Sequence, residues 1–216
     1  MAMRSPIFIL FILSVCGRTT NAIAQAKIVA SGLDQPETLI IEHGKTTFTT
    51  PTNMPGLTVK GKSDALHARA QIHRTAEGLT FDRIEASLAV ETLATGIALR
   101  DQHMRQEVFT APGGKIPEIR FEATNVLCPG VLAGRETTCK IAGSLNFRGI
   151  PRNFFLMLKI RQANPASVFR ASGDGSVKLS DYGIEPPTQF GVKTADEVQI
   201  HLEIPETATT IAPSGK

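Results

Sequence analysis

The sequence predicts an all-β domain of antiparallel strands, either closed into a barrel or layered as a sandwich. Apolar and polar residues alternate with a period of two along most of the chain, as in strands that bury one face. Turn-forming residues interrupt the alternation at 51–55, 77–78, 164–165 and 173–175. The pattern indicates about eight to ten strands in one domain, and we find no internal repeat or inter-domain linker.

Eleven stretches of the sequence are candidates for these strands. They lie near 37–42, 45–50, 56–62, 66–73, 84–91, 119–126, 141–148, 154–160, 167–172, 176–181 and 197–204. Several of their inward positions carry small residues, including Ala68, Ala70, Ala86, Ala123 and Gly143. Such residues either leave an elongated apolar space inside a barrel or allow curvature and tight packing. Composition alone does not decide between these two interpretations.

Residues 96–109 depart from the alternation and predict a short helix that ends before the loop at 112–114. In one interpretation, Ile97, Met104 and Phe109 close one end of the sheet. In the other, the intervening polar residues form a rim that meets a ligand head group. The first interpretation is the one we favour.

The amino terminus has the pattern of a secretory signal peptide at residues 1–24. Arg4 precedes a nine-residue apolar run at 7–15, and an A-x-A site ends at Ala24. At about 14 Å, this run is too short to span a bilayer of ~30 Å. We expect cleavage after Ala24, with Ala26 as second choice and a lipoprotein cysteine at Cys16 as a weaker alternative.

Two cysteines remain after cleavage, Cys128 and Cys139, and an exported protein favours their oxidation. Strand-like stretches flank them, and a turn-rich segment at 129–136 joins them. A disulfide would therefore close the base of a hairpin loop and stabilise the fold by about 2–3 kcal/mol. A redox or metal pair is the less favoured alternative, because such sites use tighter spacing and more ligands.

Charge and motif content argue against several functions. Without residues 1–24 the chain has 21 basic and 20 acidic residues, and aromatics make up 6% of the sequence, so a nucleic-acid partner is not expected. The five histidines form no HxH or HExxH motif, and we expect no metal site. With no G-x-S-x-G elbow or phosphate-binding glycine loop, we expect no catalytic residues and no enzyme activity.

The order of several segments resembles the YceI-like family, whose members are associated with polyisoprenoid binding. The most specific part is the R-D-x-H-M-R stretch at 100–105, which follows T-L-A-T-G at 92–96 and precedes Val108-Phe109. The stretches 117–124, 143–151, 177–184 and 197–204 also match in character and order. The resemblance covers about residues 37–204.

This resemblance implies an eight-stranded antiparallel lipocalin-like barrel with one short helix at one end and a lumen for a long isoprenoid-type or fatty chain. Candidate contacts for the chain are Ala68, Ala70, Ala86, Leu88, Phe121, Ala123, Leu145 and Phe147. Candidate contacts for the head group are Arg100, His103 and Arg105. No cofactor is implied beyond a bound isoprenoid lipid or quinone.

Together these observations predict a signal peptide at 1–24, a linker at 25–36, the barrel at 37–204 and a flexible tail at 205–216. The expected function is that of a periplasmic lipid carrier, with extracellular release as the alternative location. The mature chain is expected to have no integral membrane segment, and a homodimer is one candidate assembly. Two other functions stay open: an interaction module beside a membrane redox or stress system, and a hydrolase or isomerase of lipophilic substrates. A lumen of roughly 300 Å³ or more favours the carrier over a filled barrel.

Overall fold

The computed structural model describes residues 36–131, 135–162, 169–206 and 209–211. All of them belong to one compact unit, Ser31–Lys216. The predicted signal peptide at 1–24, cleavage at Ala24 and nearly all of the 25–36 linker lie outside the described residues. Within the described part of the chain, no helix has the length and apolar character needed to cross a membrane.

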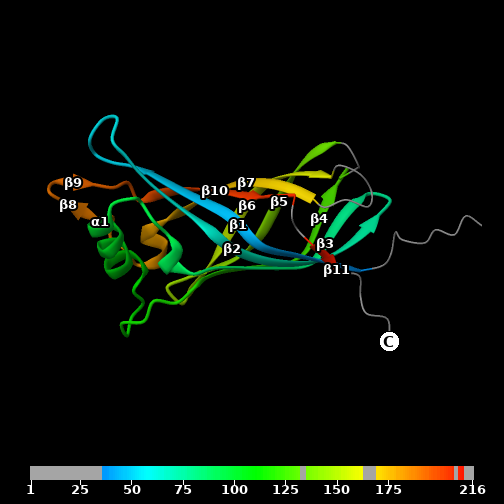
Figure 1. Ribbon diagram of the computed structural model, residues 1–216, viewed down its shortest axis with the longest axis horizontal. Coiled ribbons are helices and arrows are strands. Elements are labelled where there is room, and N and C mark those ends of the chain that lie inside the picture. The colour runs from blue at the N-terminus through cyan, green and yellow to red at the C-terminus, as the bar shows by residue number, and fades with distance from the viewer. Residues whose placement is uncertain (1–35, 132–134, 163–168, 207–208, 212–216) are drawn as a thin grey trace, which may run out of the picture. The chain divides into compact units, whose positions relative to one another are not determined.

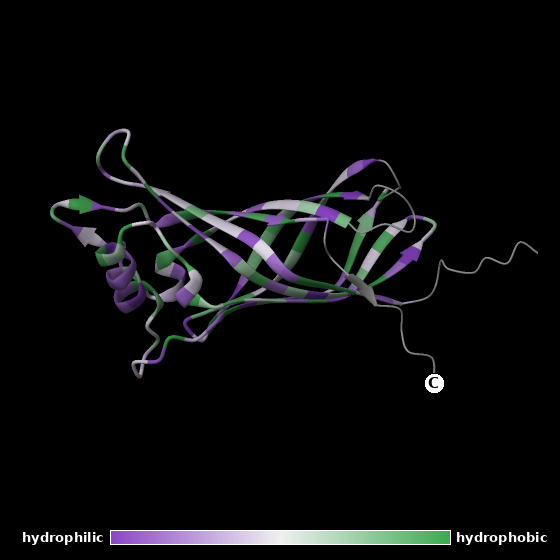
Figure 2. Cartoon of the chain, viewed as in Figure 1, coloured by the Kyte–Doolittle hydropathy of each residue, from purple (hydrophilic) through white to green (hydrophobic). Residues whose placement is uncertain are grey.

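Eight strands form a closed antiparallel barrel (Figure 1). They are β1 (Glu37–Pro51), β2 (Thr58–Thr75), β3 (Gly78–Leu88), β4 (Ile119–Pro129), β5 (Glu136–Phe147), β6 (Ile150–Gln162), β7 (Phe169–Lys178) and β10 (Glu197–Ile204). Each strand pairs with the next in this order, and β10 pairs with β1 to close the ring. The predicted eight-stranded antiparallel barrel is therefore confirmed. Along the strands, hydrophobic and hydrophilic residues alternate (Figure 2).

The remaining short elements lie mostly in two connections at one end of the barrel, which we call the helical end (Figure 1). The connection from β3 to β4 contains η1 (Val90–Thr92), α1 (Ala98–His103) and η2 (Met104–Phe109), and the connection from β7 to β10 contains η3 (Leu179–Tyr182), β8 (Thr188–Gln189) and β9 (Val192–Lys193). The predicted short helix is thus present. It begins at Ala98 and continues without a break into a π-helical turn.

A further strand, β11 (Thr209–Ile211), pairs with Thr38–Ile40 of β1. This segment lies inside the stretch 205–216 that we expected to be a flexible tail. Three consecutive β-branched residues favour extended backbone, and the start of β1 offers free ladder positions beyond its pairing with β10.

Two predicted strands, 37–42 and 45–50, are a single strand, β1, with an irregularity at Gly44. Glu42 and His43 are both exposed there, so the inward face passes from odd-numbered to even-numbered positions. An extra residue of this kind bends a strand and increases its twist. On β2, opposite Gly44, the inward face also changes between odd-numbered and even-numbered positions. The alternation of each long strand is therefore broken into two short stretches in the sequence.

The predicted disulfide joins Cys128 of β4 to Cys139 of β5, with Cα atoms 5.3 Å apart. Both cysteines are buried at the end of the barrel opposite α1. The backbone pairing of these two strands lies nearer the helical end, where Arg120–Glu122 meet Ser144–Asn146. The disulfide therefore holds together two strands whose ladder lies elsewhere.

Gly143 on β5 provides a close approach between strands. A Cβ at this position would lie 2.4 Å from the backbone oxygen of Glu122 and 2.6 Å from the ring of Phe121. Gly143 therefore accommodates the Phe121 ring and does not itself leave open space. Of the two interpretations of the small inward residues, tight packing applies at this position.

Replacing Gly143 with alanine is expected to lower the free energy of unfolding by roughly 1–3 kcal/mol, because the added methyl group overpacks against fixed backbone. Urea denaturation measures the change. Gly173→Ala is the matched control, since the nearest atoms to its methyl group would be side-chain atoms of Leu156 and Leu158 at 3.1 Å, not backbone. Equal stability of the two variants would contradict the close approach at Gly143.

Candidate functional site: an apolar cavity and its mouth

The inward faces of the strands enclose a cavity of about 760 Å³. This volume lies within the range of small-molecule binding sites, ~300–1,000 Å³. Apolar side chains line most of it, and one continuous stripe is on β6, at Phe154, Leu156, Leu158 and Ile160. At ~3.3 Å per residue, this stripe alone extends about 20 Å along the strand. The space is thus long enough for an extended hydrocarbon chain.

Most of the residues predicted to contact a chain do line the cavity. They are Ala68, Ala70, Ala86, Leu88, Phe121, Leu145 and Phe147. Ala123 is the exception: it is buried, but it is not part of the cavity wall. Its side chain belongs to the packed hydrophobic core of the barrel. That the lining residues contact a ligand stays a prediction.

Other lining residues were not singled out from the sequence. The stripe Val198, Ile200, Leu202 and Ile204 on β10 belongs to the wall, as does the β6 stripe, and both follow from strand alternation. Thr46 of β1 also lines the cavity, and its buried Oγ1 has no hydrogen-bond partner among the described residues. A hydroxyl group in an apolar wall gives a ligand one polar contact partway along the cavity.

The two ends of the cavity differ. At the end that carries the disulfide, Ile72, Leu79 and Cys128 are fully buried beyond the cavity wall and close it. At the helical end the wall includes Leu57 and Phe190, which are exposed to solvent. The cavity therefore opens at the helical end, and we call this opening the mouth.

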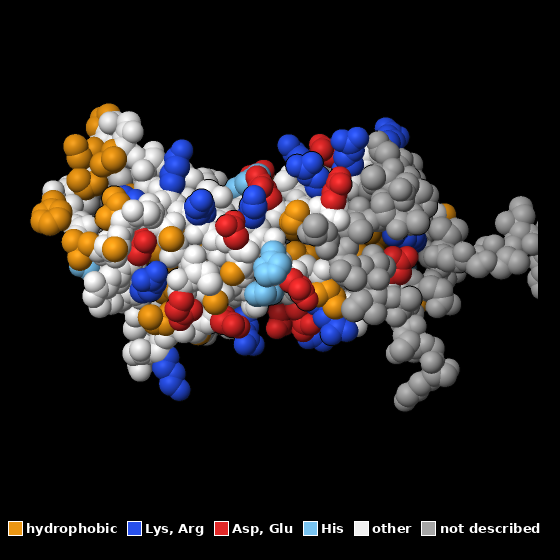
Figure 3. Space-filling view, viewed as in Figure 1, with side chains coloured by type: hydrophobic (Ala, Val, Ile, Leu, Met, Phe, Trp, Pro, Cys, Tyr) orange, Lys and Arg blue, Asp and Glu red, His pale blue; other side chains and the backbone are white. Residues whose placement is uncertain are grey.

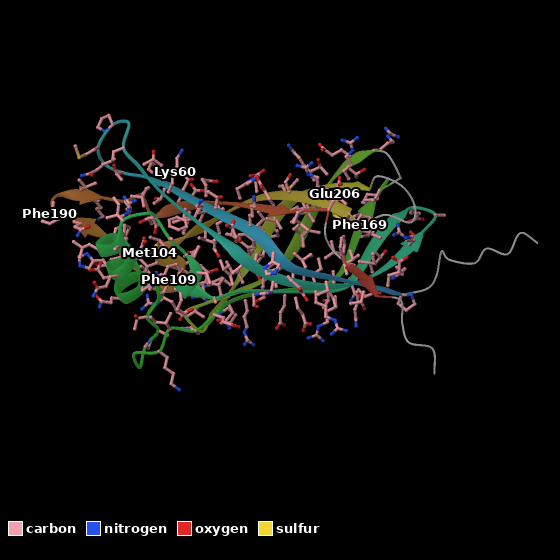
Figure 4. All side chains as sticks on the ribbon, in the orientation of Figure 1. Lys60, Met104, Phe109, Phe169, Phe190 and Glu206 are labelled. Carbon is pink, nitrogen blue, oxygen red and sulfur yellow. A yellow bond between two sulfur atoms is a disulfide. The ribbon has the colours of Figure 1, made fainter. Side chains whose placement is uncertain are left out.

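Aromatic rings hold the helical segment against the barrel beside the mouth. Phe109 of η2 contacts Phe147 of β5 edge to face, with ring centroids 5.3 Å apart, and Phe147 contacts Tyr182 of η3 at 5.1 Å. Met104 and Phe109 line the cavity as expected (Figure 4). Ile97 does not: it is exposed, and it lies at the N-cap of α1 with extended backbone, before the helix begins.

The three predicted head-group residues divide into two sets. Arg100 and His103 line the mouth, and His103 Nδ1 lies 3.0 Å from Nε2 of Gln189, another lining residue. Arg105 is not part of the cavity wall. Its Nη2 donates to the backbone oxygen of Glu91 at 3.4 Å, and its Nε is buried without a partner among the described residues. The sequence analysis missed Gln189, which lies in a stretch without strand periodicity.

Asp101 of α1 holds the segment that precedes this helix through hydrogen bonds to Thr95. Its carboxylate is buried and accepts hydrogen bonds from the backbone amide of Thr95, at 2.8 Å, and from the Thr95 hydroxyl. Arg100 in turn donates from Nε to Thr95 Oγ1 at 2.8 Å and from Nη2 to the Thr95 carbonyl at 3.0 Å. Asp101 thus fixes Thr95, and Thr95 fixes the guanidinium group of Arg100 at the mouth.

The ionised form of Asp101 is favoured in the folded protein. Burial is the largest single influence and opposes ionisation, but the two hydrogen bonds from Thr95 and the positive charges of Arg105 and Arg100 together outweigh it. The pKa of Asp101 is therefore lowered from its ordinary value of 3.8.

Replacing Asp101 with asparagine is expected to lower the free energy of unfolding by about 1–3 kcal/mol near neutral pH, through loss of charge-assisted hydrogen bonds. Because the folded-state pKa is the lower one, the carboxylate stabilises the fold above pH 3.8 and loses this effect as the pH falls through the folded-state pKa. Urea unfolding of both proteins across this range should show the difference between them shrinking in acid. The exposed Glu42→Gln is the control, and a difference that stays constant with pH would contradict this role of Asp101.

Comparison with known proteins agrees with this architecture. The family model described as the YceI-like domain matches residues 38–205, and no curated protein matches the chain. A polyisoprenoid-binding domain from Saccharophagus degradans, implicated in plant cell wall breakdown, superimposes with a TM-score of 0.54 at 15% identity, covering 82% of this chain and 98% of that one.

Two further solved structures share the fold. Burkholderia cenocepacia BcnA gives a TM-score of 0.57 at 14% identity, covering 78% of this chain and 96% of its own. The Campylobacter jejuni YCEI protein gives 0.52 at 17% identity, covering 76% and 90%. At these identities the structural likeness shows the fold, while the family match spans most of the chain. The chain therefore belongs to the YceI-like family.

Proposed function

We propose that this protein is an exported carrier that holds a long isoprenoid-type or fatty chain in its barrel and performs no chemistry on it. The observation that carries the proposal is the apolar cavity of about 760 Å³, whose lining at the helical end includes the polar residues Arg100, His103 and Gln189. A polyisoprenoid-binding relative with the same fold supports this ligand class. The signal-peptide pattern at 1–24 supports export, to the periplasm first and to the outside as the alternative.

The energetics favour a long chain over a short one. Each buried methylene group stabilises the complex by about 0.8 kcal/mol, so ten of them contribute about 8 kcal/mol. Association itself costs roughly 4–15 kcal/mol. A chain of only a few carbons would therefore have no net affinity for the barrel. A chain that fills the length of the β6 and β10 stripes would bind with net affinity.

Polar groups at the mouth suit a head group that contains oxygen. Arg100 and His103 line this end with Glu107 and Gln189, and each of them has a side-chain nitrogen or oxygen for hydrogen bonding. The ring oxygens of a quinone and the terminal oxygen of a polyprenyl compound are ligands of this kind. The chain supplies affinity in this arrangement, and the mouth supplies orientation.

The test is to purify the protein from its native compartment and analyse an organic extract by mass spectrometry, with native mass measured in parallel. We expect a co-purifying lipid with a long unbranched or isoprenoid chain at up to one molecule per barrel. Protein that is reproducibly empty and takes up no prenyl lipid from detergent would contradict the proposal.

Filling part of the lumen should weaken binding without unfolding the protein. Ala68 on β2 faces the cavity, while its neighbour His67 is exposed on the outer surface. We expect Ala68→Phe to weaken binding of a fluorescent prenyl probe by about tenfold or more, since each lost 1.4 kcal/mol is a factor of ten. His67→Phe, which adds the same ring on the opposite face, should bind like the wild type. Equal affinity of the two variants would show that the chain does not occupy the lumen.

A further inference from the structure

Large apolar side chains are exposed around the mouth on three separate segments. They are Met54 and Leu57 between β1 and β2, Ile97 and Leu99 at the start of α1, and Phe190 between β8 and β9, and their exposed fractions run from 45% to 94%. We call these five residues the rim. Hydrophobic side chains gather at this end of the molecule in Figure 3. Contiguous exposed apolar surface on a soluble domain marks an interaction site.

Hydrogen bonds fix the three segments to one another. Asn53 donates from its backbone amide to the Lys193 carbonyl at 2.9 Å and from Nδ2 to the Gly191 carbonyl at 3.1 Å, and its Oδ1 accepts from the Lys193 amide at 2.9 Å. On the other side of the β8–β9 turn, Gln189 contacts His103 of α1 at 3.0 Å. The rim is therefore a built surface and not a set of independent loops.

Phe190 is presented by a strained turn. It has φ of 51° and precedes Gly191 with φ of 80°, in a two-residue connection between β8 and β9. Both residues of such a turn favour Asn, Asp or Gly, and a bulky residue with positive φ is an outlier. The side chain is 94% exposed, so no packing compensates for the strain, and it projects from the end of the molecule in Figure 4. Strained residues of this kind indicate function.

The rim is continuous with the cavity and is free of acidic groups. Leu57 and Phe190 belong to both the rim and the cavity wall, so a chain moves from the rim into the barrel along apolar surface. The segments 51–61, 94–100 and 186–195 contain no Asp or Glu and carry Lys60, Arg100 and Lys193. Two acids flank the last segment: Glu185, which is exposed, and Asp196, whose carboxylate accepts hydrogen bonds from Ser180. The nearest acids to α1 in sequence are Asp101, which is buried, and Glu107 at the mouth.

From these observations we infer that the rim docks on the surface of a lipid bilayer with anionic headgroups and passes the chain directly between bilayer and barrel. The inference rests on the proposed function and adds to it the surface through which the ligand is transferred. Apolar tips that project from three segments suit insertion among acyl chains, where burial of each tip contributes to binding. The cations beside them match the negative surface potential of such a membrane.

Flotation with vesicles tests the inference. The protein is purified as its host exports it, so all variants share one amino terminus, and it is mixed with phosphatidylcholine vesicles containing phosphatidylglycerol. We expect Met54→Asn/Ile97→Asn, at two rim residues outside the cavity wall, to lower vesicle affinity about tenfold or more relative to the wild type. The double variant should remain folded, because both side chains are exposed and asparagine suits the N-cap position of α1 at 97. Phe155→Asn, at an exposed phenylalanine on the barrel wall, should float like the wild type.

A second pair of variants tests the charges. Lys60→Gln and Lys193→Gln are each expected to weaken binding to anionic vesicles about fivefold, and to leave binding to pure phosphatidylcholine vesicles unchanged. Lys60 is labelled near the mouth in Figure 4.

Uptake of a prenyl probe from detergent, measured in parallel, separates this inference from the proposed function. Wild type that binds vesicles, together with a rim variant that loses vesicle binding but keeps uptake, supports docking. Wild type that does not float, or that floats no better than the rim variant, overturns docking whatever the uptake. A rim variant that turns a dimer into a monomer with unchanged flotation also overturns it, and assigns the rim to contact between copies of the chain.

Discussion

The structure depends on one constraint: a sheet of eight strands that closes on itself encloses more space than its own inward side chains fill. Closure through the β1–β10 pairing gives every barrel strand a partner on both edges, and it fixes the width of the interior. Alanines at 68, 70 and 86 then stand where larger residues would fill the centre. The open volume is thus a consequence of strand number combined with the choice of side chains on one face.

The same constraint produces the difference between the two ends. Fully buried residues from β2, β3 and β4 close the end near the disulfide. At the other end, the two long connections bring α1 and the β8–β9 hairpin to the opening, and the hydrogen bonds of Asn53, Gln189 and Asp101 fix their positions. In the proposed carrier, a ligand that enters from this side would place its polar end among Arg100, His103 and Gln189.

Strand periodicity predicts much of this fold, but not its details. The β6 and β10 stripes, the disulfide partners and the helix between β3 and β4 all follow from the sequence. The length of β1 does not, because the bulge at Gly44 moves the inward face to positions of the other parity. The β8–β9 hairpin also escapes prediction, since two-residue strands are too short to show a period.

The site residues that the sequence did not place correctly have the same physical explanation. Alternation says that Ala123 faces inward, but only the packing of neighbouring strands decides that it lies behind the cavity wall. Arg105 shares a helical segment with Arg100 and yet turns toward the carbonyl of Glu91. The exposure of Ile97 depends on where the chain bends before α1. Each of these outcomes depends on contacts between segments far apart in the sequence.

The most direct measurement is the electron density of a crystal of the protein isolated from its own source. The account predicts elongated density inside the barrel, bordered by the β6 and β10 stripes and ending in a polar group near Arg100 and Gln189. A barrel whose inward side chains meet across the centre, leaving no room for a hydrocarbon chain, would contradict it.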